Sequence, residues 1–122
     1  MHGSFSRADT WNFMAMQGPD FKSHFVDPAP ASNADIGRTI AEVMHLDLGD
    51  KGKLVGRVLI ETLPNGAITD VGSRVITSEP APNGLATVVD MQVVGDTRYF
   101  DAAGFPGRTV GVSSAALPKA QH

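Results

Sequence analysis

The residue of this chain best suited to metal chemistry is His2, which is followed directly by a glycine. A neutral imidazole is a good zinc ligand, and a neighbouring glycine lets the backbone pass close to an ion. The spacing alone does not separate this interpretation from an ordinary histidine near the start of a chain, which is the commoner case. The order of the residues that follow His2 is therefore needed to decide what the histidine does.

Other catalytic motifs are missing from the sequence. It contains no Gly-Lys-Ser/Thr phosphate loop at a strand–helix junction, no G-x-S-x-G elbow and no Ser-His-Asp order. It also contains no cysteine, which excludes disulfides and thiolate metal sites.

The order of residues resembles that of a known enzyme superfamily. The run HGSFSRAD-x-x-N, followed by A-x-x-GPDFK, resembles the C-terminal catalytic segment of the alkaline phosphatase superfamily. The closest resemblance is to its branch of type I phosphodiesterases, nucleotide pyrophosphatases and sulfatase-like enzymes. In that branch a His-Gly pair supplies the last metal ligand, and a Gly-Pro-x-Phe turn follows the next strand. The resemblance continues through SNADI and its helix to GRVL, and it covers about the first half of the chain.

This resemblance implies a metal-dependent phosphoester, phosphodiester or sulfate ester hydrolase, of which this chain is a C-terminal portion that is inactive alone. His2 is then a ligand of zinc or another divalent metal. The nucleophile and the other ligands come from the upstream part of the same catalytic domain, the substrate is a small anionic ester, and the location is periplasmic or secreted. The alternative is a free-standing α+β binding or interaction module, with Tyr99, Phe100 and Phe105 in its contact surface.

Six further polar positions match, or partly match, the family pattern. Ser4 matches without an assigned role, and Arg7 is expected to lie on the surface rather than face an anionic substrate. Asp9 and Asn12 are expected to fix a turn through backbone hydrogen bonds rather than touch the substrate. The pair of Asp20 and His24 has the spacing of the Asp-x-x-x-His metal pair, but that pair belongs upstream of the His-Gly segment. We therefore interpret these two residues as parts of a solvated loop.

Composition sets further limits on function. The chain has 122 residues, a net charge of −3 and no basic run, which argues against non-specific nucleic-acid binding. No stretch approaches the roughly 20 apolar residues of a membrane span. The N-terminus has no cationic segment followed by an apolar one, so no signal peptide is predicted.

The first half of the chain predicts one strand and one helix. Residues 11–17, WNFMAMQ, are apolar on both faces and end at Gly18-Pro19, which indicates a buried strand. Residues 33–46 predict an amphipathic helix with a Ser32–Asp35 capping box and its apolar stripe packed in the core. The members of that stripe are Ile36, Ile40, Val43 and Met44, and His45 beside it is expected to interact with the helix dipole.

The second half predicts β structure. Residues 54–63 form a short strand or a helical turn, and 75–77 a short strand. We predict a hairpin formed by residues 85–94 and 97–102 across Gly95-Asp96. We predict a third strand at 108–112. The predicted class is α+β, or a fragment of an α/β domain. Residues 1–63 are the expected segment of a catalytic core, and 64–122 a β-rich extension within one compact unit.

Overall fold

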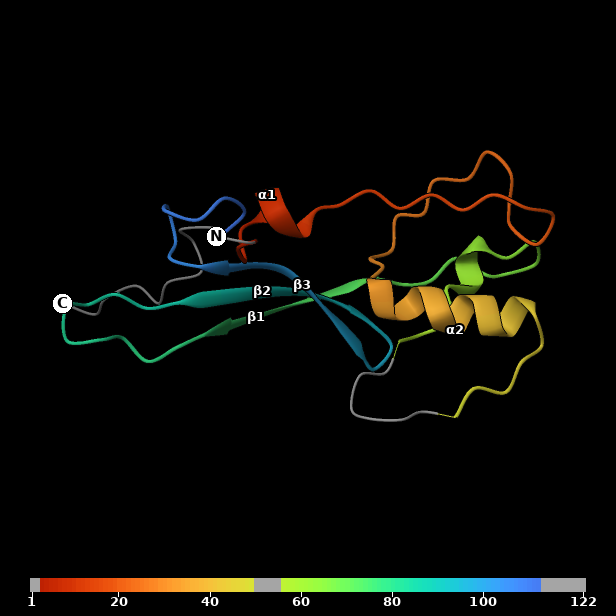
Figure 1. The fold of residues 1–122 in the computed structure, drawn as a ribbon. Helices are drawn as coiled ribbons and strands as arrows, with labels where there is room; N and C mark the ends of the chain where they lie inside the picture. Colours follow the sequence, from red (N-terminus) through yellow and green to blue (C-terminus); the bar gives the residue numbers. More distant parts are fainter. Residues whose placement is uncertain (1–2, 50–55, 113–122) are drawn as a thin grey trace. The chain divides into compact units, whose positions relative to one another are not determined.

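The computed structural model describes residues 3–49 and 56–112 of the chain. It divides into two compact units that are interleaved along the sequence (Figure 1). One, which we call the sheet unit, comprises Met1–Phe13, Gly72–Val93 and Phe100–His122. The other, the helix unit, comprises Met14–Val71 and Val94–Tyr99.

The sheet is three-stranded and antiparallel, in the order β1-β2-β3. Its strands are β1 (Gly72–Thr77), β2 (Val88–Val94) and β3 (Thr97–Gly104). In the β1–β2 register Gly72 lies opposite Val93 and Thr77 opposite Val88. Gly95, with a φ of 55°, turns β2 into β3, because a tight hairpin needs positive φ at this position. The predicted hairpin is confirmed.

The core of the sheet unit is small. Val88 and Ala102 are fully buried, and Val112 joins them with 6% of its surface exposed. The N-terminal segment attaches to this unit through its backbone, because the Ala103 N–H donates to the Phe5 carbonyl at 2.7 Å. A short helix that the sequence analysis did not predict, α1 (Arg7–Thr10), begins beside this contact.

The third strand of the sheet is not the predicted one. Residues 108–112 form turns, so the prediction of a strand there is wrong. The N–H groups of Arg108 and Thr109 both donate to the Phe105 carbonyl at 3.0 Å, and Gly111 has a φ of 92°. The backbone N–H groups of Arg108 and Thr109 are therefore already used within the turn and cannot donate to a neighbouring strand. The third strand is β1 instead, of which only residues 75–77 were predicted.

The helix unit contains α2 (Asn33–Val43), which is shorter than the predicted 33–46. The capping box is confirmed, since Asp35 Oδ2 accepts the Ser32 N–H at 2.7 Å. The helix ends early because His45 adopts a left-handed φ of 53°. The Leu46 N–H then donates back to the Ala41 carbonyl at 2.8 Å, which is the bond of a Schellman cap.

Within the predicted element at 54–63, only η1 (Ile60–Thr62) is a helical turn, which agrees with one of the two predicted alternatives, and residues 56–59 have no regular secondary structure. Residues 54 and 55 lie outside the described residues. Leu59, just before η1, is 1% exposed and is the largest fully buried side chain in residues 3–49 and 56–112. The loop before α2 attaches here, because the Lys22 N–H donates to the Thr62 carbonyl at 2.8 Å.

The apolar stripe of α2 does not pack in a core, so that prediction is wrong. Ile36, Ile40 and Met44 are 38%, 49% and 59% exposed. The buried side of the helix carries Asp35 and Thr39 instead, at 0% and 1% exposure. The physical reason is that the described elements of the helix unit cover the polar side of α2.

Residues 11–17 are extended but are not a buried strand, so this prediction is also wrong. Trp11 and Phe13 are 66% and 91% exposed, and no residue of the segment belongs to a ladder with another described residue. A strand is buried only when neighbouring strands and a covering layer are present.

Among the described residues, no helix is long and apolar enough to cross a bilayer. The expected division of the chain after residue 63 stays a prediction.

Two glycine substitutions test the packing of α2 against residue 56. A Cβ on Gly56 would lie 2.1 Å from the Ala34 carbonyl oxygen, a backbone atom that cannot swing away. We expect Gly56→Ala to destabilise the chain by about 2 kcal/mol or more. The control is Gly37→Ala within α2, where a Cβ meets nothing within 4 Å. The control should leave stability unchanged or raise it by up to about 1 kcal/mol. Thermal unfolding followed by circular dichroism measures both; equal melting temperatures for the two variants would contradict the packing.

Candidate functional site

His2, the predicted metal ligand, lies outside the described residues. The polar residues after it form a local turn. The Asn12 side-chain amide donates to the Asp9 carbonyl at 3.0 Å, and the Asp9 carboxylate accepts a bond from the Ser4 hydroxyl. The Asn12 side chain thus bonds to the backbone of the turn, as expected, whereas the Asp9 carboxylate bonds to a side-chain hydroxyl instead.

Arg7 is paired within the sheet unit. Its Nε and Nη2 donate to the two carboxylate oxygens of Asp101 at 3.0 and 2.5 Å, and its guanidinium lies 5.1 Å from the Trp11 ring centre. Trp11 Nε1 also donates to Asp101, at 2.9 Å. Burial raises the pKa of Asp101, but the hydrogen bonds from Arg7 and Trp11 outweigh burial and hold it below its usual value. The guanidinium is thus engaged with protein groups, and the side chain is 35% exposed.

The pair of Asp20 and His24 forms no metal site with other described residues. No group of three or more His, Cys, Asp or Glu side chains in residues 3–49 and 56–112 is arranged to hold a metal ion. His24 and Lys22 line an open hollow of about 470 Å³ in the loop. The Lys22 ammonium is already used, since it donates to the carbonyls of Glu61 and Gly66 at 2.9 and 2.6 Å.

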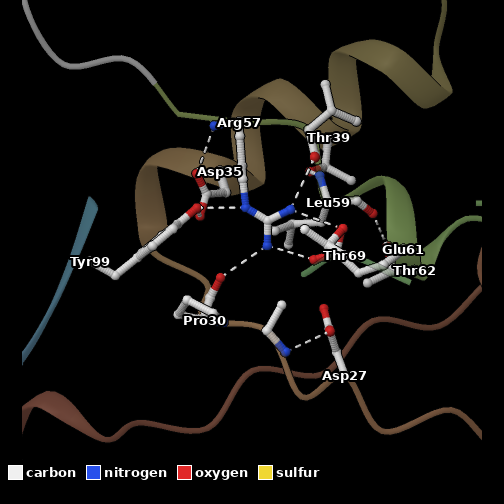
Figure 2. A network of polar contacts seen from close by, with 12 residues as sticks. Asp27, Pro30, Asp35, Thr39, Arg57, Leu59, Glu61, Thr62, Thr69 and Tyr99 are labelled. Atoms are coloured by element: carbon white, nitrogen blue, oxygen red, sulfur yellow. Dashed lines mark hydrogen bonds and ion pairs between the residues drawn. The ribbon is translucent and has the colours of Figure 1, made fainter. Parts of the chain in front are cut away.

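The most extensive polar arrangement is centred on Arg57 in the helix unit (Figure 2). Two of its nitrogens donate to the two oxygens of Glu61 at 2.8 and 2.5 Å. Its Nε donates to the Tyr99 hydroxyl at 2.8 Å, and Nη2 also donates to the Pro30 carbonyl at 3.0 Å. A weaker bond of 3.4 Å reaches the Val58 carbonyl. Each of the five N–H donors of a guanidinium therefore has an acceptor.

Asp35 joins the start of α2 to this network. It is fully buried, and its carboxylate accepts the Arg57 backbone N–H at 2.8 Å and the Tyr99 hydroxyl at 3.0 Å, besides its bond to Ser32. Burial and the bond to Asp35 raise the pKa of Tyr99 to about 12. Asp35, the N3 residue of the capping box, is thus also a member of the network, and its bond to the Arg57 N–H holds the start of α2 against residue 57.

Three threonines complete the network (Figure 2). Thr39 Oγ1 accepts the Leu59 N–H at 3.0 Å, and the Thr62 hydroxyl donates to the Leu59 carbonyl at 2.6 Å. The Thr69 hydroxyl donates to Glu61 at 3.2 Å. Among the described residues, no buried side-chain nitrogen or oxygen lacks a hydrogen-bond partner. A network this fully satisfied offers no free group to a ligand, and we assign it a role in holding the helix unit together.

The pKa values of two carboxyls of the network, Glu61 and Asp27, are shifted in opposite directions. Burial raises the pKa of Glu61, but the bonds from Arg57 outweigh burial and the pKa lies below its usual value. Asp27 accepts the Ala29 N–H at 2.9 Å and lies beside Glu61. Burial and the neighbouring Glu61 raise the pKa of Asp27. The Asp27 carboxylate is thus partly withdrawn from water beside a second carboxylate.

The sequence analysis missed this network. Arg57 and Glu61 lie four residues apart in GRVLIE, and this spacing is the one local signal for the pair. Family models, curated proteins and solved structures were compared with the chain, and none matches it.

The first prediction for this network concerns the fork geometry of Arg57. Arg57→Lys keeps the charge but cannot bind both Glu61 oxygens, Tyr99 and Pro30 together. We expect a loss of about 2–4 kcal/mol, because polar groups with little access to water are left unpaired. The control is Arg74→Lys on the exposed strand β1, which should change stability by less than about 0.5 kcal/mol. Chemical denaturation measures both variants, and a loss of less than 1 kcal/mol for Arg57→Lys would contradict the assigned role.

The second prediction concerns pH. Since the folded-state pKa of Asp27 is raised, its contribution to stability is present below the unfolded pKa and is lost as pH rises through the folded pKa. Asp27→Asn should therefore raise the melting temperature at pH 7 relative to the unsubstituted chain, and the gain should shrink towards pH 3–4. Asp20→Asn, the same change at an exposed loop position, should show no such pH-dependent gain. Melting curves at several pH values measure this; an equal gain at all pH values would refute the assignment to Asp27.

Proposed function

We propose that this chain is the C-terminal portion of a metal-dependent hydrolase of phosphoesters, phosphodiesters or sulfate esters. It would contribute His2 and scaffold, and it would be inactive alone. The proposal rests on the residue order from His2-Gly3 to Gly18-Pro19-Asp20-Phe21, which resembles the last catalytic segment of the alkaline phosphatase superfamily.

The structural observation that supports it most is the partly exposed apolar stripe of α2. A helix of a complete domain turns its apolar side towards the core. Here Ile36, Ile40 and Met44 face away from the buried side, at 38%, 49% and 59% exposure. A surface of this kind is typical of an interface. A segment that folds against the rest of a catalytic domain would have such a surface.

The chemistry of the proposed site also requires more protein. A catalytic zinc needs about three protein ligands and one open position. No such group of ligands exists among the described residues, so His2 would need partners from the upstream part of the domain. Zinc or another divalent metal would supply Lewis acidity, polarising a small anionic ester and lowering the pKa of the nucleophile. A periplasmic or secreted location is part of the same proposal.

One observation favours the alternative of a binding module. In the sheet unit the rings of Phe5 and Phe100 are 5.7 Å apart, and these side chains are 61% and 60% exposed. Exposed aromatic pairs occur at protein interfaces.

Of the residues expected in the contact surface of such a module, Phe100 is exposed and Phe105 is 38% exposed, but Tyr99 is buried at 7%, so its inclusion is wrong. The hydroxyl of Tyr99 is held inside by Arg57 and Asp35. A free-standing module would use the exposed rings without any metal, and the experiment below separates the two functions.

The test uses the longer polypeptide that contains this chain and the upstream part of the domain. We expect His2→Ala to lower its bound zinc and to reduce hydrolysis of p-nitrophenyl phosphate and its diester analogue by about 100-fold or more. Far-ultraviolet circular dichroism should stay unchanged. The matched control is His45→Ala, at an exposed position after α2, which should keep metal and turnover. Metal content and turnover are the measurements. Full activity of the His2 variant would remove this residue from the site, and metal-dependent turnover by the isolated chain would overturn the proposal.

A further inference from the structure

We propose that the loop before α2 contains a binding site for a small aromatic carboxylate. Figure 1 shows this loop leading into the start of the helix. The site is the open hollow of about 470 Å³ that is lined by residues within 16–26, among them Lys22 and His24. All of these residues belong to the helix unit, so the inference is independent of the proposed function, which concerns His2.

The first observation is a positive charge without a counter-charge. The half-buried Lys22 ammonium donates to the backbone carbonyls of Glu61 and Gly66 at 2.9 and 2.6 Å, and it lies 4.9 Å from the centre of the Phe25 ring. Carbonyls and an aromatic face attract a cation but carry no net charge. Among the described residues, no Asp or Glu side chain forms an ion pair with Lys22, and none lines the hollow. An anion in the hollow would therefore balance this charge.

The second observation is a pair of polar side chains without protein partners. The Ser23 hydroxyl and the His24 imidazole line the hollow, are exposed, and make no hydrogen bond with any described residue. A hydroxyl and a neutral imidazole can each donate one hydrogen bond to a carboxylate oxygen. His24 has a φ of 55°, a backbone region that few residues other than glycine adopt and that is found preferentially at ligand-binding sites.

The third observation is the apolar part of the lining. Phe21 and Phe25 are half-buried beside Met16, and all three line the hollow. Aromatic side chains and the methionine thioether pack well against the face and edge of another ring. Ligand pockets of roughly 300–1,000 Å³ combine such a lining with a few polar groups. The lining therefore favours a ligand with an aromatic ring.

The charge of the ligand follows from the charge of the lining. With a neutral imidazole, the hollow presents the single positive charge of Lys22. A carboxylate carries one negative charge and matches it. A phosphate monoester carries a charge of about −1.5 to −2 at pH 7, so part of its charge would be left without a partner. We therefore assign the site to an aromatic carboxylate rather than to an aromatic phosphate.

A nuclear magnetic resonance titration of the ¹⁵N-labelled chain tests the site, with benzoate as the probe. We expect saturable shifts of the amide signals of residues 21–25, with a dissociation constant on the order of 1 mM. Benzamide keeps the ring without the charge, and acetate keeps the charge without the ring. Each should bind at least about 10-fold more weakly than benzoate. The absence of saturable shifts, or equal affinity for benzamide, would overturn the site. Tighter binding of phenyl phosphate would overturn the assignment to a carboxylate.

Two matched histidine variants provide a second measurement. His24→Gly removes the imidazole, and glycine adopts a φ of 55° without strain, so the fold should be kept. His45→Gly is the control, because His45 is also exposed and has a φ of 53° but lies after α2. We expect His24→Gly to weaken benzoate binding about 5-fold and His45→Gly to leave it unchanged. Equal affinities of these two variants would refute the placement of the ligand beside His24.

A third variant tests the charge itself. Lys22→Gln removes the charge but keeps two N–H donors for the carbonyls of Glu61 and Gly66. We expect the benzoate-induced shifts to disappear, while circular dichroism shows a folded chain. Unchanged benzoate affinity in a folded Lys22→Gln chain would overturn the proposal. If this variant does not fold, the comparison of benzoate with benzamide on the unsubstituted chain decides the role of the charge.

Discussion

The helix unit depends on the burial of Arg57 beside Glu61. Removing a guanidinium and a carboxylate from water costs several kcal/mol for each ion, and this cost is offset only when every donor and acceptor is matched. Here the side chain of Glu61, the hydroxyl of Tyr99 and the carbonyls of Pro30 and Val58 supply the acceptors. Segments far apart in the sequence must therefore be held together at once, or a charge is left unpaired.

The same constraint decides which side of α2 is buried. Asp35 must face the network to accept the bonds from Arg57 and Tyr99, and Thr39 lies one turn further along the same side. Each residue of an α-helix is rotated by about 100° from the one before it. Ile36 and Ile40 each follow one of these polar residues, so they are turned away from the buried side. The polar interior and the bare apolar stripe are therefore two consequences of one arrangement.

The sequence predicts the features that depend on neighbouring residues. The capping box needs only Ser32 and Asp35, and the hairpin needs only two β-rich runs around Gly95-Asp96; both are present. The Arg57 network was missed because most of its partners are distant, with Tyr99 42 residues away. The buried stripe was predicted on the assumption that apolar faces point inward, which fails when no described element covers them. The candidate metal ligand remains untested, because His2 lies outside the described residues.

The polar interior of the helix unit selects one arrangement of its elements, but it contributes little to the free energy of unfolding. Apart from Leu59, its largest fully buried side chains are Glu61, Thr39 and Asp35, and these gain little from leaving water. A satisfied buried network nevertheless selects one arrangement, because any other leaves a polar group without a partner. Apolar burial contributes about 25 cal/mol for each Å² removed from water. Ile36, Ile40 and Met44 of α2 are still 38–59% exposed, so covering them would add hydrophobic stabilisation.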